Sequence, residues 1–62
     1  MKVNVGDILV CPKRSKNYLV IEVSDFVYLL NAEKMYAREE DRSISDYWKV
    51  SERFLNENFI MM

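Results

Sequence analysis

The sequence predicts a mainly β protein, a small and partly open barrel of four to five short strands with one short helical turn before the last strand. Short runs of β-branched and aromatic residues are separated by polar breaks. The chain has 62 residues with one glycine and one proline, so a single packed domain over residues 1–62 is expected. Near the C-terminus an aromatic run leads into a serine-capped segment and a further apolar run, which would close such a domain.

The first strand is expected to begin near Val3 and to be interrupted at Gly6-Asp7. Glycine suits a bulge or a tight turn there, because a positive φ costs it little. The strand continues as Ile8–Cys11 and ends at Pro12, which lacks a backbone donor. A solvated polar loop over residues 13–17 follows.

Two further strands are predicted to pair as a hairpin. Tyr18–Val23 is rich in β-branched residues, and Phe26–Leu30 is a second apolar run. The two residues between them, Ser24-Asp25, favour a turn.

Residues 31–46 allow two interpretations. The segment contains good helix formers, and Ala32, Met35 and Tyr36 would form one narrow apolar face of a helix. Alternatively it extends the third strand and turns through the charged tip Glu39–Arg42, which is the interpretation we favour. The pattern leaves both open.

The C-terminal third predicts a strand, a helical turn and a last strand. Ile44–Val50 alternates, which would bury Ile44, Trp48 and Val50 on one face. Ser51 is placed to cap the next turn, and Phe59-Ile60-Met61 returns to an extended run.

In their order, these elements resemble the SH3-like small β-barrels. The resemblance is carried by Val5-Gly6-Asp7, the Tyr18–Leu30 hairpin, Trp48-Lys49-Val50-Ser51, Phe54-Leu55 and Phe59-Ile60. In that fold a short helical turn precedes the last strand, and Ser51–Asn58 stands in the matching place. Many tiny proteins of bacteriophages and mobile elements are similar. The resemblance implies RNA-binding, peptide-binding or inhibitory roles, because the fold hosts all three.

Composition and charge favour a soluble cytoplasmic protein, in the host cytoplasm if the gene is phage-borne. The single cysteine excludes an internal disulfide, no apolar run approaches the roughly 20 residues of a membrane helix, and the N-terminus becomes charged too early for a signal peptide. Residues 1–20 hold four basic side chains against one carboxylate, whereas residues 21–62 hold five basic and nine acidic ones. The chain therefore lacks the basic excess of most nucleic-acid binders.

No pattern predicts catalysis, a metal site or a cofactor. Histidine is absent, which removes the commonest general base and metal ligand. Cys11 is interpreted as a small core residue, and Gly6 alone makes no phosphate loop. Glu39-Glu40-Asp41 lacks the spaced ligands of a calcium loop and is flanked by arginines, so it is interpreted as solvated charge.

The hypothesis for function is therefore non-catalytic binding to another protein. Eight aromatic residues exceed what so small a core encloses, and tyrosine and methionine are favoured at interfaces. The predicted partner-binding residues are Tyr18, Tyr28, Met35 and Tyr36. The alternative is an RNA- or DNA-binding module that uses Lys13, Arg14 and Lys16, with Tyr18 beside them for stacking. A structural subunit or a homo-oligomer would use the same aromatic surface.

Overall fold

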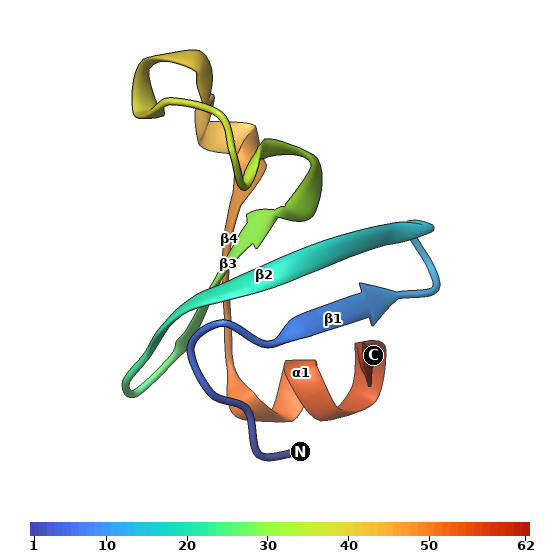
Figure 1. Ribbon diagram of the computed structural model, residues 1–62. Coiled ribbons are helices and arrows are strands. Elements are labelled where there is room, and N and C mark those ends of the chain that lie inside the picture. The colour runs from blue at the N-terminus through green and yellow to red at the C-terminus, as the bar shows by residue number, and fades with distance from the viewer.

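The computed structural model describes all 62 residues (Figure 1). Its elements are β1 (Ile8–Cys11), β2 (Lys16–Val23), β3 (Val27–Asn31), the single-turn 3-10 helices η1 (Ala32–Lys34), η2 (Glu39–Asp41) and η3 (Ile44–Asp46), β4 (Tyr47–Val50), α1 (Glu52–Asn58) and β5 (Ile60–Met61). The mainly β fold class predicted from the sequence is confirmed, with a short helix directly before the last strand.

The five strands form one antiparallel sheet in the order β4-β3-β2-β1-β5. The two edge strands, β4 and β5, do not pair with each other, so the sheet is not closed into a barrel. In the sequence α1 connects these two edges, and it crosses the molecule on the β1 side of the sheet (Figure 1). The fold is thus a partly open barrel.

The hydrophobic core lies on one face of the sheet and against α1. The register places Leu9 beside Tyr18, and Val27 beside Val50, on this face. The core consists of ten buried residues: Val3, Leu9, Cys11, Tyr18, Val20, Val27, Leu29, Val50, Leu55 and Phe59. Alternation along the strands explains which strand residues are buried, because every second side chain faces the core.

The turn at Gly6 fixes the N-terminal segment against β2. Gly6 has a φ of 100°, in the left-handed region that favours glycine. Its amide donates to the Val20 carbonyl at 2.8 Å, and the Val20 amide donates to the Asp7 carbonyl at 2.9 Å. The predicted turn is confirmed, but Val3 belongs to no strand, because regular pairing begins only at Ile8.

Four aromatic rings form a cluster that includes two residues of the core, Tyr18 and Phe59. Trp48 of β4 has its ring centroid 5.6 Å from Tyr18 of β2, 5.4 Å from Phe54 of α1 and 5.5 Å from Phe59. The Arg14 guanidinium carbon lies 3.9 Å from the centroid of the Trp48 ring, and Arg14 Nη1 donates to the Tyr18 hydroxyl at 3.2 Å. This cluster joins α1 to β2 and β4 and helps to compensate for the missing β4–β5 ladder.

The strand predicted over Ile44–Val50 is wrong in its first half. Ile44 lies in η3 and is 92% exposed, and β4 begins only at Tyr47. A backbone bond from the Asp46 amide to the Ser43 carbonyl, 3.0 Å long, closes a turn that turns Ile44 away from the sheet. Val50 is buried as predicted, whereas Trp48 is half-buried against the core.

Residues 31–46 form neither the long helix nor an extended third strand. β3 ends at Asn31, because its side-chain Oδ1 accepts a hydrogen bond from the Glu33 amide at 3.1 Å and starts η1. The loop part of our preferred interpretation is right. At the hairpin the turn includes Phe26, so β3 starts one residue later than expected, and β2 starts two residues earlier, at Lys16.

Replacing Trp48 by alanine is expected to lower the free energy of unfolding by about 2–3 kcal/mol, less than the loss for a fully buried tryptophan because the ring is only half-buried. For a domain of this size, that loss corresponds to a fall in Tm of roughly 10–20 °C in a thermal melt. Arg14→Ala removes the stacked cation and its hydrogen bond to the Tyr18 hydroxyl, and is expected to cost about 1 kcal/mol. Equal Tm values for Trp48→Ala and the wild type would contradict a structural role for the cluster.

Candidate functional site

The β3–β4 loop, residues 32–46, extends away from the sheet and α1 (Figure 1). It takes nearly a quarter of the chain but contributes none of the ten core residues. Its single buried residue is the polar Asp46. Long connections without strands or long helices are uncommon in compact domains and usually serve a function. The loop is therefore the first candidate for a functional surface.

Arg42 ties the two arms of the loop together. Its Nε donates to the Lys34 carbonyl at 3.2 Å, its Nη2 to the Met35 carbonyl at 3.4 Å, and its Nη1 to the Tyr47 hydroxyl at 3.4 Å. In the opposite direction, Lys34 Nζ donates to the Asp41 carbonyl at 3.3 Å. These bonds satisfy backbone carbonyls that no strand pairs, and they give the loop one defined shape.

Asp46 anchors the base of the loop. The Ser43 amide donates to its Oδ2 at 2.9 Å, the Ser43 hydroxyl lies 3.3 Å from the same oxygen, and Lys34 Nζ lies 4.0 Å away. The backbone hydrogen bond from Ser43, together with the Lys34 charge, lowers the pKa of Asp46 below its ordinary value against the opposing effect of burial. The carboxylate is thus ionised at neutral pH.

The loop presents two large apolar side chains to solvent, Tyr36 and Ile44, each 92% exposed. Neither packs on the core, although the backbone around both is held by the Arg42 and Asp46 bonds. Met35, beside Tyr36, is half-buried. Exposed apolar residues on an ordered scaffold are typical of protein-binding surfaces.

Acidic side chains of the same loop are exposed as well. Glu33, Glu39 and Glu40 are exposed and form no ion pair, whereas Asp41 lies 3.7 Å from Arg38 Nε. The cations Lys34 and Arg42 are engaged inside the loop. The loop therefore exposes two large apolar side chains and three carboxylates that form no ion pair.

The structure separates the residues predicted for partner binding. Met35 and Tyr36 lie on the β3–β4 loop, and Tyr28 is half-buried on β3, on the sheet face opposite the core and paired with Lys49. Tyr18 is 3% exposed, because its ring packs against Trp48 and Phe59. Tyr18 therefore lies in the core and is not part of the candidate surface.

Ile44 was not among the predicted site residues. Alternation with Trp48 and Val50 suggested a strand, and a strand would have buried it. The sequence signal that competes with alternation is Ser43 followed three residues later by Asp46, a spacing that favours a helical turn. That spacing identifies the turn, but not the exposure of the isoleucine.

The three predicted phosphate contacts do not form one free basic set. Residues 12–15 form the β1–β2 turn, in which Ser15 has a φ of 54°. Lys13 and Lys16 are exposed and unpaired with any carboxylate, but the Arg14 guanidinium lies on Trp48 and bonds to Tyr18. Two lysines are left for contact with a polyanion.

Other chemistry-bearing groups are scattered. Cys11 is 2% exposed and unbridged, as its interpretation as a core residue requires. The structure gathers no three histidine, cysteine, aspartate or glutamate side chains in positions to hold a metal ion. None of its helices has the length and apolar character needed to cross a membrane.

Comparison with protein-family models, with curated proteins and with solved structures found no match to this chain. No relative therefore indicates a family for this chain.

Stability is expected to depend on pH through Asp46. A carboxyl whose pKa is lowered in the folded state stabilises the fold above its ordinary pKa of 3.8, and this contribution is lost as pH falls through the folded value. Asp46→Asn keeps the size and an acceptor but not the charge. In thermal melts, the Tm of the wild type should exceed that of Asp46→Asn at about pH 7, and the difference in Tm should shrink towards about pH 3. A gap of constant size would contradict the role given to this carboxylate.

Proposed function

We propose that the protein is a non-catalytic binding module that acts by stoichiometric association with another protein through its β3–β4 loop. The observation that carries this proposal is the 92% exposure of Tyr36 and Ile44 on a loop whose backbone is fixed by Arg42 and Asp46. Two apolar anchors on a pre-organised support lose little conformational entropy when they bind.

The energetics favour these two residues as the centre of an interface. Burying a large apolar side chain from water is worth about 1.5–3 kcal/mol, and both side chains are almost fully available for burial. Tyrosine is among the residues most enriched at interface hot spots. The partner would need an apolar pocket to receive each anchor.

The acidic surface indicates the charge of that partner. Glu33, Glu39 and Glu40 would lie at the rim of the interface and would face basic side chains on the other protein. Rim charges mainly accelerate association, and salt screens them. The partner surface is thus an apolar pocket with a basic border.

The finer identity we propose follows the resemblance given above. The chain would be an SH3-like barrel and a phage or mobile-element accessory protein, acting in the host cytoplasm to modulate or inhibit a host factor. Support comes from the helix placed directly before the last strand of an open antiparallel sheet. A stoichiometric inhibitor needs only a rigid surface, and a domain of this size can provide one.

The Tyr36→Ala/Ile44→Ala double variant is expected to lose partner binding. Each truncated anchor should cost about 2 kcal/mol, so the Kd should rise by more than about 100-fold. The measurement is capture from host lysate followed by calorimetric titration of the purified partner. Because neither side chain contacts the core, the Tm should stay close to that of the wild type.

The matched control is Ile60→Ala, which truncates a 58% exposed isoleucine on β5, away from the loop. It should bind the partner as tightly as the wild type. If the double variant bound equally well, or if Ile60→Ala alone abolished binding, the β3–β4 loop would not be the interface.

Oligonucleotide titration tests the nucleic-acid alternative. Short single- and double-stranded oligonucleotides at about 50 and about 200 mM salt should show no binding at micromolar concentration. The diagnostic variant is Lys13→Ala/Lys16→Ala with Arg14 left in place, because removing Arg14 would also disturb Trp48. Tight binding that weakens with salt and is lost in this variant would overturn the protein-binding proposal.

A further inference from the structure

The core and α1 occupy one face of the sheet, and the opposite face carries side chains of its own. Side chains alternate between the two faces along each strand. The register of β2, β3 and β4 arranges those of the opposite face in two rows across the strands. One row is Leu19, Leu30 and Tyr47, and the other is Glu22, Tyr28 and Lys49. We call this surface the outer sheet face.

The outer sheet face is partly apolar. Leu30 is already buried and offers no surface. Leu19 and Tyr28 are half-buried, however, and Tyr47 is 41% exposed. None of these side chains belongs to the core cluster. Removal of their remaining surface from water would be favourable.

The second row places opposite charges on the two sides of Tyr28. Glu22 on β2 and Lys49 on β4 are both in register with Tyr28, so each lies one strand spacing, about 4.8 Å, from β3. Both charged side chains are exposed, and neither forms an ion pair. The Lys49 ammonium lies 4.3 Å from the centroid of the Phe26 ring, so it has an aromatic contact but no carboxylate.

A two-fold axis along β3 makes this surface complementary to itself. Rotation about that axis exchanges the β2 and β4 sides, so Glu22 of each copy faces Lys49 of the other. Leu19 of each copy likewise faces Tyr47 of the other. A two-fold axis across the strands would instead set Glu22 against Glu22 and Lys49 against Lys49, and like charges in contact repel. The charges therefore favour the axis along β3.

We propose that the outer sheet face binds a second copy of this chain, and that Glu22 of each copy pairs with Lys49 of the other. Sheets packed face to face lie about 10 Å apart, a gap that a glutamate and a lysine side chain span together. The net charge of −1 adds little repulsion between copies.

The size of the contact sets the strength of this dimer. Three strands about 4.8 Å apart, the shortest of them with 4 residues, bury only a few hundred Å² per copy. Standard interfaces bury about 800 Å² per partner. The dimer is therefore weak, with a Kd on the order of 100 µM.

Sedimentation velocity of the whole protein between about 10 µM and about 1 mM spans this Kd. The wild type should pass from monomer towards dimer, and its Kd should rise several-fold between about 50 and about 500 mM salt, because salt screens the ion pairs. Glu22→Lys and Lys49→Glu each create like charges at both symmetric contacts, so each should raise the Kd at least about 10-fold. An equimolar mixture of the two variants opposes unlike charges again and should associate as the wild type does.

The matched control is Glu57→Lys, which makes the same charge change at an exposed position of α1 and should leave the Kd unchanged. A wild type that stays monomeric at about 1 mM would overturn the proposal. So would single variants that associate as tightly as the control, or a mixture that does not restore association. The Tyr36→Ala/Ile44→Ala variant should dimerise as the wild type does, and loss of its dimer would place the contact on the loop instead.

Discussion

The packing of α1 across an open sheet is the constraint on which this small domain depends. Leu55 is fully buried and Phe59 nearly so, and both reach the core from the segment that links the two unpaired edges β4 and β5. Ser51 starts the helix by accepting a hydrogen bond from the Phe54 amide at 3.0 Å. Trp48 then stacks against Phe54 and Phe59. Without this helix the apolar face of a five-stranded sheet would be open to water, and a chain of 62 residues has no second layer to cover it.

Because the sheet and α1 supply the core, the β3–β4 loop does not have to bury apolar side chains. Apolar burial is concentrated in β1–β4, α1, Val3 and Phe59, and the β3–β4 loop holds its shape through hydrogen bonds and ion pairs instead. Polar networks of this kind specify geometry and add little net stability. Side chains at the loop surface can accordingly be replaced without loss of core packing. Tyr36 and Ile44 are two such side chains.

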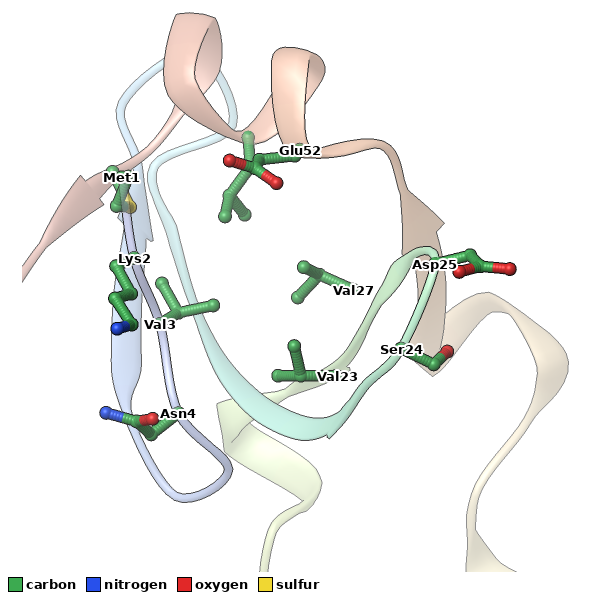
Figure 2. Close-up of a pocket in the computed structure, with 10 residues that line it drawn as sticks. Met1, Lys2, Val3, Asn4, Val23, Ser24, Asp25, Val27 and Glu52 are labelled. Atoms are coloured by element: carbon green, nitrogen blue, oxygen red, sulfur yellow. The ribbon is translucent and has the colours of Figure 1, made fainter.

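The β3–β4 loop and a pocket lined by the N-terminal segment 1–4, the β2–β3 hairpin and α1 (Figure 2) lie at opposite ends of the β3–β4 ladder. Arg14 belongs to neither, because its guanidinium lies on the Trp48 ring and donates to the Tyr18 hydroxyl.

The sequence by itself determined the features that depend on neighbouring residues: the glycine turn, the end of β1 before Pro12, the β2–β3 hairpin, the serine-capped α1, and the mainly β class. Local chemistry decides these, since side-chain alternation and cap residues act within a few positions. It also gave Met35 and Tyr36 as candidates for a surface. Only the tertiary structure decided that Tyr18 is buried, that Ile44 is exposed and that Arg14 lies on Trp48. These outcomes depend on strand register and on contacts between residues far apart in the chain, and no local pattern encodes which of two apolar side chains finds a partner across the sheet.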